Sequence, residues 1–474
     1  MENKTMFEKY LKKNADKQME LYAYGCPPEF RLEADGIVSP VIQDFRTVER
    51  YQEYLQCGFN VLYPQDEGIY NIDETWEESK AKFVFDTASK AGVKKILLFD
   101  KYIRRLSHTV GGLIGEGKLF HSEEQLDKVI AARMAPYKDH PAFFGVVLAD
   151  EPDWTKLKAI GQIYRSIKRV CPKAFVQCNL YPINVLHSVD RRFPDGGDLF
   201  DRFKKYLTMF VEETGADYIM YDNYPFHHSP DEFGRCFFRM YFKALQIAGQ
   251  VCKEKGVKLY FVLQSFAMYV GGQLTCKTPT EAQMFYQTNA LLGFGAKQLS
   301  YYTYWSDGGV NVNAEIRPDN SAMVSRMGER TPLWYSVQKG NKMIQKLFPV
   351  ISNFDYEADR YIIKTPFKSG PWHLEYTGRS DLKYVQATTD QEVAMIYELK
   401  DKSNNQYMYV VQNITYNDAE VALGLPKQKT TLTFDKKFTK IDIFDGNEWR
   451  TQTLENGEYT AELAAGYAEY ILPY

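Results

Sequence analysis

The stretch FFGVVLADEPDW, residues 143–154, decides how the rest of the sequence is interpreted. Its first seven residues are apolar or glycine, a composition that predicts a strand buried on both faces. The polar run Asp150-Glu151-Pro152-Asp153 follows at once and ends the strand. Strands of this kind belong to parallel sheets, whose carboxyl ends form the ligand-binding edge of the fold.

Seven similar apolar runs flank this one along the chain. Amphipathic stretches of helical spacing separate them, and several stop at a glycine that suits a helix end, as at Gly58, Gly92 and Gly215. Eight such alternations predict an α/β fold, namely a (β/α)8 TIM barrel over residues 1–350. An open doubly wound sheet is the alternative, but no Gly-x-Gly-x-x-Gly turn follows any strand. The other runs begin at Leu21, Phe59, Lys94, Phe175, Asp217, Lys258 and Lys297.

The pattern changes near Ile351. From there, short runs of alternating apolar and polar residues appear, such as QYMYVVQNIT at 406–415 and YAEYILPY at 467–474. Turn residues such as Asn456-Gly457 separate these runs, and helical spacing is absent. Residues 351–474 are therefore expected to form an all-β sandwich, an accessory domain behind the barrel.

Composition and charge restrict the partners. The chain has 474 residues, of which 45% are hydrophobic, and a net charge of -3, so no basic surface for nucleic acid is expected. No segment approaches the ~20 apolar residues of a membrane-spanning helix. The seven cysteines are scattered and contain no Cys-x-x-Cys, and nothing indicates an oligomeric state. Because the first residues lack a signal-peptide pattern, a cytoplasmic location is expected, or secretion if a signal peptide has been removed.

Acidic, amide and aromatic residues stand at the predicted strand ends, which a barrel brings together at one face. Such a lining, nearly free of basic residues, suits a neutral polyhydroxylated ligand. His227 and His228 have no third ligand at metal spacing, so neither a metal nor another cofactor is expected. The candidate binding residues are Tyr63, Asp100, Asn179, Tyr221, Tyr224, Gln264, Tyr304 and Trp305.

Glu151 is the strongest catalytic candidate. A carboxyl group at a strand end, beside Asp150 and aromatic side chains, has its pKa raised by burial and by like charge. It would then stay protonated near neutral pH and could donate that proton. The structural alternative is that Asp150 and Glu151 only cap the following helix, since Asp-Glu-Pro is also a favourable helix start.

The order of these motifs resembles the clan-A glycoside hydrolases. In that clan the fourth strand ends in Asn-Glu-Pro, with the Glu as acid/base, and a Trp of the eighth strand closes the sugar site. Glu151 and Trp305 match these positions, and the C-terminal sandwich is similar to the accessory module attached to such barrels. The resemblance implies hydrolysis of an O-glycosidic bond in an oligosaccharide or glycoside, with Glu151 as general acid.

The sequence departs from the clan at two positions. Asp150 replaces the Asn before the acid, and Gln264 ends the seventh strand, where the clan has its nucleophilic Glu. A neutral amide cannot form a glycosyl ester, so three alternatives stay open. Asp222 supplies the second carboxylate, the substrate's 2-acetamido group attacks while Asp150 orients it, or the barrel binds carbohydrate without catalysis. A Schiff-base aldolase would need a lysine at a strand end, where only Lys101 stands.

The sixth strand ends in consecutive residues of different chemistry, Tyr221 and Asp222. Successive side chains of a strand point to opposite faces. One of the two should therefore face the interior of the sheet and the other the surrounding helices.

Overall fold

The computed structural model describes residues 5–34, 37–183, 192–226, 232–270, 273–306, 321–363, 382–390, 393–414 and 427–474. Two four-stranded parallel sheets form its centre. The first has the order β1 (Glu20–Ala23), β12 (Ala296–Tyr302), β9 (Lys258–Gln264) and β8 (Tyr218–Asp222). The second has the order β4 (Ile69–Tyr70), β5 (Ile96–Asp100), β6 (Phe143–Asp150) and β7 (Phe175–Asn179).

Backbone hydrogen bonds also join one sheet to the other. Next to β7, the amide of Leu180 donates to the carbonyl of Met220 in β8 at 2.9 Å. On the far side, segment 59–63 lies between β1 and β5: Val61 N donates to Leu21 O at 3.2 Å, and Leu62 N donates to Lys95 O at 2.8 Å. The strand-like run that begins at Phe59 therefore pairs with its expected neighbours.

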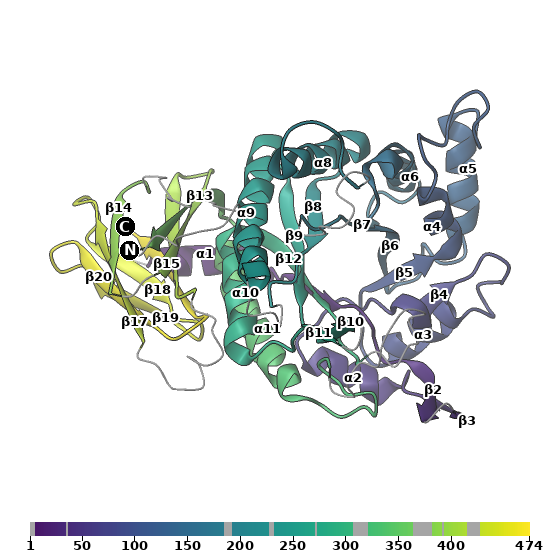
Figure 1. The fold of residues 1–474 in the computed structure, drawn as a ribbon, viewed down its shortest axis with the longest axis horizontal. Coiled ribbons are helices and arrows are strands. Elements are labelled where there is room, and N and C mark those ends of the chain that lie inside the picture. The colour runs from purple at the N-terminus through teal and green to yellow at the C-terminus, as the bar shows by residue number, and fades with distance from the viewer. Residues whose placement is uncertain are drawn as a thin grey trace.

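Helices alternate with these strands and lie outside them (Figure 1). Local sequence explains their ends, because Asp198 caps the first turn of α8 and Gly215, with φ of 69°, ends it in the left-handed region that glycine tolerates. The predicted α/β class is thereby confirmed. The helices are α2 (Val48–Gln56), α3 (Lys80–Lys90), α4 (Lys101–Ser107), α5 (Glu123–Met134), α6 (Leu157–Val170), α8 (Leu199–Thr214), α9 (Glu232–Lys255), α10 (Glu281–Gly293) and α11 (Pro332–Ile351).

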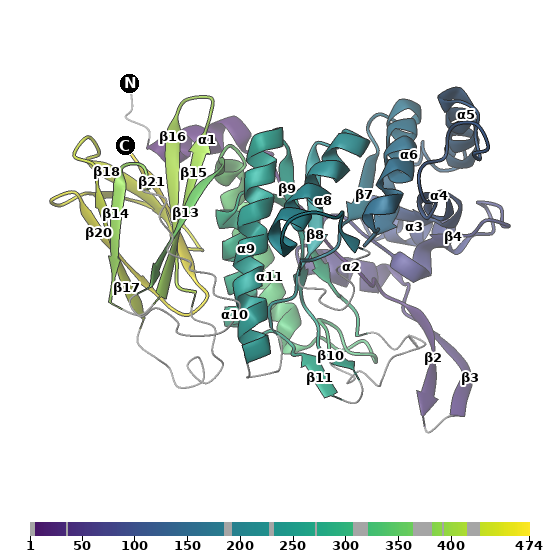
Figure 2. The same cartoon turned by 45° about the horizontal axis from the view of Figure 1, so that its top comes forward.

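Short additions surround this centre. Strands β2 (Glu29–Ala34) and β3 (Ile37–Asp44) pair as an antiparallel hairpin that extends away from the helices, as Figure 2 shows. Strands β10 (Met268–Val270) and β11 (Gln273–Cys276) form a second hairpin after β9. Single 3-10 turns are present at Gln65–Gly68 and Trp154–Lys156.

The C-terminal part consists of two antiparallel sheets. A core of side chains including Ile396, Tyr409, Leu432 and Ile471 fills the space between them. The six-stranded sheet has the order β13 (Asp355–Ile363), β15 (Val393–Asp401), β16 (Gln406–Gln412), β21 (Ala468–Pro473), β18 (Lys440–Phe444) and β19 (Trp449–Thr453). The three-stranded sheet has the order β14 (Val385–Thr389), β17 (Gln428–Phe434) and β20 (Glu458–Leu463).

The six-stranded sheet packs against the helices with its other face. Alternate residues of β15, such as Met395 and Tyr397, belong to the large core that includes α10 and α11. Tyr470 OH donates to Asn289 Oδ1 of α10 at 2.7 Å, and Gln412 Nε2 donates to Tyr286 O at 2.9 Å. The two parts of the chain therefore share one continuous hydrophobic core.

The first helix, α1 (Met6–Asn14), packs against this C-terminal part. Tyr10 OH donates to Asp401 Oδ2 at 2.8 Å, and the ring of Phe7 stacks on Trp449 at 5.2 Å. The boundary at residue 350 falls in the last turn of α11 and stays a prediction. Among the described helices, none is both long and apolar enough to span a membrane.

Candidate active site

An amide group joins two carboxylates at the carboxyl ends of β6, β7 and β8. Asn179 Nδ2 donates to Asp150 Oδ1 and to Asp222 Oδ1, each at 3.0 Å. The two oxygens are therefore no more than twice that distance apart. Asn179 and Asp222 are each only 4% exposed, whereas Asp150 is exposed. Three residues predicted from three separate strand ends thus lie together.

Glu151 follows directly and leaves the strand through a sharp turn. Its φ is 45°, in the left-handed region where a residue with a Cβ is strained. Its amide donates to Asn179 O at 2.8 Å. The hydroxyl of Tyr206, from α8, donates to Pro152 O at 2.5 Å and accepts from Tyr181 N at 3.4 Å. This unusual backbone is therefore held on both sides, beside Asp150 and Asp222.

Burial and like charge change the acidity of both partly enclosed carboxyl groups. Burial, followed by the charges of Asp222 and Asp150, raises the pKa of Glu151 to about 9, while Arg192 opposes the rise. Burial, followed by the charge of Asp150, raises the pKa of Asp222 to about 7, although hydrogen bonds from Asn179 and Tyr224 oppose it. At neutral pH Glu151 therefore carries its proton, and Asp222 is the carboxyl that ionises first.

Tyrosines form a wall beside these carboxyl groups. The ring of Tyr24 lies edge-on to the rings of Tyr63 and Tyr302, with ring centres 4.7 Å and 5.8 Å apart. The ring centres of Tyr302 and Tyr224 are 6.1 Å apart. Tyr24 OH accepts from Gln177 Nε2 at 2.6 Å. The charges of Asp150 and Asp222 contribute, after burial, to a raised pKa of Tyr24. Tyr63 and Tyr224 were predicted from the sequence, whereas Tyr24 and Tyr302 were not.

The structure also decides how the sixth strand presents its last two residues. Tyr221 is completely buried and packs edge-on against Phe203 of α8 at 5.6 Å and Phe261 at 4.8 Å. It therefore faces the helices, and we take it out of the proposed site. Asp222 points the opposite way, toward Asn179.

Tyr304 and Trp305 differ in what surrounds them. Tyr304 is completely buried, edge-on to Tyr54 at 4.9 Å, and accepts from Trp334 Nε1 at 3.4 Å, so it belongs to the core and not to the proposed site. Trp305 is 3% exposed and packs on Phe45 at 4.9 Å. Its indole N–H is buried without a hydrogen-bond partner, so it stays a candidate for ligand binding.

Asp100 serves α4 and not the site. Its carboxylate is fully buried and accepts from the amides of Tyr102 at 2.9 Å and Ile103 at 3.2 Å, as a helix cap does. Arg133 of α5 forms an ion pair with it at 2.8 Å, and Tyr137 OH donates to it at 3.0 Å. These contacts occupy both oxygens, so we correct the assignment of Asp100 as a substrate-binding residue.

Gln264 connects three loops. Its Oε1 accepts from Phe226 N at 2.9 Å, and its Nε2 donates to Lys277 O at 2.9 Å and to Phe226 O at 3.3 Å. The side chain is completely buried. The amide at the end of the seventh strand is therefore explained by backbone carbonyls that need a donor, and we assign it a structural role instead of substrate binding.

Replacing Gln264 by Glu is expected to lower the free energy of unfolding by about 2–4 kcal/mol, because the carbonyls of Phe226 and Lys277 lose the hydrogen bonds from the Gln264 amide and face a carboxylate instead. Urea denaturation at pH 7 measures this, with Gln264→Met as the control that removes the hydrogen bonds without adding charge. Gln264→Glu should be the less stable of the two variants, and it should gain no hydrolytic activity. A variant as stable as the wild type that hydrolyses glycosides faster would instead show a vacated nucleophile position.

No family model and no curated protein sequence matches this chain. Several solved structures similar to it are glycoside hydrolases. A catalytic mutant of a family 42 β-galactosidase from G. stearothermophilus has a TM-score of 0.49 and 9% identity, with 89% of this chain and 95% of that chain covered. A family 5 glycoside hydrolase from Bacteroides vulgatus has a TM-score of 0.45 and 10% identity, covering 96% and 88%. An endo-β-1,4-mannanase from Thermotoga petrophila has a TM-score of 0.40 and 12% identity, covering 94% and 98%.

These structures belong to the class of enzymes that the sequence motifs resemble. Their identities to this chain lie between 9% and 12%.

Two amide side chains at the ends of β7 and β8 are buried, of which only Asn179 was predicted from the sequence. Asn223, next to Asp222 in the sequence, is 1% exposed, and within the described residues neither polar atom of its side chain has a hydrogen-bond partner. Asn179 Oδ1 is likewise unpartnered. Buried amides without partners are rare in folded proteins, so they suit a ligand that supplies hydroxyl or amide groups.

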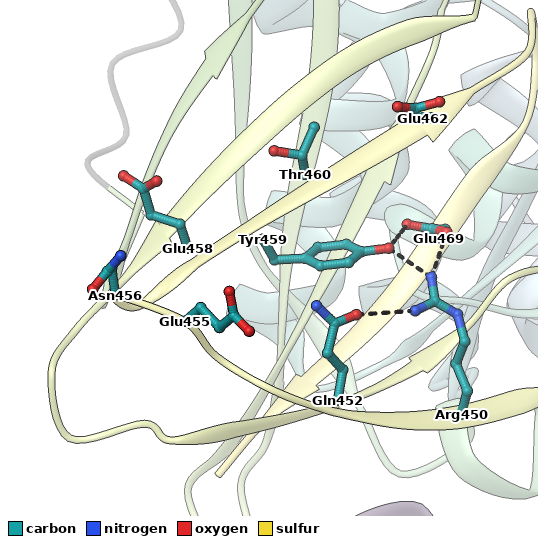
Figure 3. A pocket seen from close by; sticks show the side chains of 9 residues that line it. All are labelled: Arg450, Gln452, Glu455, Asn456, Glu458, Tyr459, Thr460, Glu462 and Glu469. Atoms are coloured by element: carbon teal, nitrogen blue, oxygen red, sulfur yellow. Dashed lines mark hydrogen bonds and ion pairs between the residues drawn. The ribbon is translucent and has the colours of Figure 1, made fainter.

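A polar groove of about 570 Å³ lies on the C-terminal sheets (Figure 3). Arg450 Nη2 donates to Tyr459 OH at 2.7 Å and to Glu469 Oε1 at 3.2 Å, and Tyr459 OH donates to Glu469 Oε2 at 2.6 Å. This groove contains none of the predicted site residues. Among the described residues, no group of His, Cys, Asp and Glu could hold a metal ion, and His227 and His228 lie outside them.

Proposed function

We propose that this chain hydrolyses O-glycosidic bonds, with Glu151 as the general acid. The observation that carries the proposal is the convergence of Glu151, Asp150 and Asp222 around the amide of Asn179. A carboxyl group whose pKa is about 9 holds a proton at neutral pH. It can pass that proton to the leaving oxygen as the bond from the anomeric carbon to that oxygen breaks.

We further infer that the two parallel sheets are halves of one (β/α)8 barrel, followed by a β-sandwich. The hydrogen bonds at Leu180 and at segment 59–63 support this arrangement, because the first joins the end of β7 to β8 and the second group joins β1 through segment 59–63 to the start of β5. The catalytic residues would then stand at the carboxyl ends of barrel strands four to six, the face where such barrels place their active sites.

Asp222 is the better of the two candidates for the second catalytic group. It is buried, and hydrogen bonds from Asn179 and Tyr224 hold its carboxylate in one position. As a general base it would take a proton from the attacking water, and as a nucleophile it would bond to the anomeric carbon. Asp150 is exposed and accepts from the same amide, which suits a group that orients a substrate hydroxyl or acetamide.

Carbohydrate would bind against the tyrosine wall of Tyr24, Tyr63, Tyr224 and Tyr302. Aromatic faces pack against the C–H surface of a pyranose ring, and the unpartnered amides of Asn179 and Asn223 can take hydroxyl groups. Side chains alone supply the proposed chemistry.

The rival function is a barrel that binds carbohydrate without cleaving it. Gln264 at the seventh strand suggests it from sequence, because the residue cannot serve as a nucleophile. The structure gives Gln264 another role, because its amide donates hydrogen bonds to backbone carbonyls. Its presence is therefore no longer an argument for a protein that only binds carbohydrate. The strained backbone and raised pKa of Glu151 favour catalysis instead.

A panel of phenyl glycosides, whose leaving group needs a proton, tests the proposal with the wild type and Glu151→Gln, and includes sugars with and without a 2-acetamido group. Release of the aryl alcohol by the wild type and its loss in the variant are expected. A strict need for the acetamide would assign the attacking role to the substrate and leave Asp150 as its orienting group. Equal release by both proteins would remove Glu151 from the mechanism, and sugar binding without release from any glycoside would favour the rival function.

A further inference from the structure

Arg192 places a positive charge beside the proposed proton donor. Its guanidinium carbon lies 4.6 Å from the centre of the Tyr181 ring. The amide of Tyr181 donates to Tyr206 OH, which itself donates to Pro152 O, so Tyr181 stands next to the turn that carries Glu151. Glu151 and Arg192 also shift the pKa of Tyr181 in opposite directions, which agrees with this neighbourhood.

Three other partly or fully buried arginines pair with carboxylates, whereas Arg104 over the Phe99 ring, like Arg192, pairs with no described carboxylate. Arg46 pairs with Glu29 and Asp44, Arg133 pairs with Asp100, and Arg50 pairs with Glu53. No ion pair or hydrogen bond joins Arg192 to any residue within the described ranges, although its side chain is partly buried. None of its N–H donors is bonded to an acceptor within the described residues, so they are open to an acceptor that a substrate brings.

Neighbouring carboxylates are already engaged. Asp150 and Asp222 accept from the amide of Asn179, and Asp153 forms an ion pair with Lys156 at 2.8 Å. A carboxylate that came with the substrate would meet a flat guanidinium that lies over the Tyr181 ring. Guanidinium and carboxylate groups match in a two-pronged arrangement that neutral hydroxyl groups do not reproduce.

We propose that Arg192 binds a carboxylate of the substrate, so that the sugar next to the cleaved bond is an acidic one such as a uronic acid. The proposal rests on the proposed function for the position of the sugar. It replaces the neutral ligand expected from sequence, because Arg192 carried no motif that would have placed it at the strand ends.

Calorimetric titration of the wild type with D-glucuronate and D-galacturonate, and with glucose and galactose as the neutral counterparts, tests the binding step. At least one uronate is expected to bind about 10-fold or more tightly than its neutral counterpart. Arg192→Gln should weaken uronate binding by about 10- to 100-fold and leave neutral sugars unchanged, while Arg192→Lys should retain part of the preference. Arg450→Gln is the matched control, because Arg450 also lies over a tyrosine ring but on the C-terminal sheets.

The proposal is overturned if neither uronate binds more tightly than its neutral counterpart, or if Arg192→Gln weakens both kinds of sugar equally. Hydrolysis of matched aryl uronides and aryl glycosides separates it from the proposed function. Cleavage of neutral glycosides, without preference and unaffected by Arg192→Gln, would refute the carboxylate site and keep the hydrolase. Uronate binding that depends on Arg192, with no cleavage of any uronide, would keep the carboxylate site and refute the hydrolase.

Discussion

Replacing Glu151 by Gln is expected to lower kcat/KM about 10²- to 10⁴-fold on glycosides whose leaving group is a poor one. The carboxyl group is the proton source for the departing oxygen, and positioned general acids contribute an effect of this size. The amide keeps the size of the side chain and cannot donate an acidic proton. Turnover of aryl glycosides by the wild type and the variant at pH 7.5 or thereabouts measures the effect.

The leaving group gives this prediction an internal control. The dinitrophenolate of a dinitrophenyl glycoside is a good leaving group that departs without protonation. Glu151→Gln should therefore cleave this substrate nearly as fast as the wild type does. Glu398→Gln is the matched variant, because Glu398 is 3% exposed and burial raises its pKa to about 7, but it lies in the C-terminal β15. Equal losses on good and poor leaving groups would mean that Glu151 acts by something other than proton donation.

Replacing Asp222 by Asn should lower kcat by about 10²- to 10⁴-fold with little change in KM. The carboxylate is fixed by Asn179 and Tyr224 and lies next to Glu151, where it can activate water or attack the anomeric carbon. The asparagine keeps the shape of the side chain but offers neither a base nor a nucleophile. Single-turnover hydrolysis separates this loss in the chemical step from a loss in binding.

Asp150→Asn is the companion variant, since Asp150 accepts from the same amide but is exposed. We expect it to lose about tenfold or less on glycosides without an acetamide, as for a single orienting hydrogen bond. If Asp150→Asn loses more activity than Asp222→Asn, and only on 2-acetamido substrates, the substrate-assisted mechanism replaces the one proposed here.

The class of fold and part of the site could be predicted from sequence for a physical reason. Buried parallel strands are apolar nearly throughout, so the polar residue that ends each run, such as Asp150, Asn179 or Asp222, marks the carboxyl end of a strand. Because parallel strands align these ends, residues from three runs could be placed together. The hydrogen bonds of Asn179 to both carboxylates agree with that prediction.

Partners that come from distant segments could not be predicted. Asp100 stands at a strand end like the others, but Arg133 of α5 and Tyr137 occupy it. From sequence, Gln264 stands where the resembling enzymes have their nucleophilic Glu. Only the structure shows that its amide bonds to the carbonyls of Phe226 and Lys277. Whether a strand-end side chain is free for a ligand depends on loops, whose positions leave no periodic signal in the sequence.

The alternation of side chains along a strand predicted only part of the site. It required Tyr221 and Asp222 to face opposite ways, and the structure shows that Asp222 faces the other carboxyl groups. Tyr24, which directly follows Ala23 at the end of the first strand, stands at the same kind of position but was not predicted. Arg192 gave no such signal, because it does not stand at the end of any of the eight apolar runs.

The pH dependence of kcat/KM between pH 5 and pH 10 or so tests most directly whether these two carboxyl groups perform the reaction. Asp222 must lose its proton to act, so activity should rise through about pH 7, and Glu151 must keep its proton, so activity should fall through about pH 9. In Glu151→Gln the alkaline fall should disappear from the residual activity on a glycoside with a poor leaving group. Activity that instead falls above the ordinary pKa of a glutamate, near pH 4.5, would contradict the assignment of Glu151 as a buried, protonated acid.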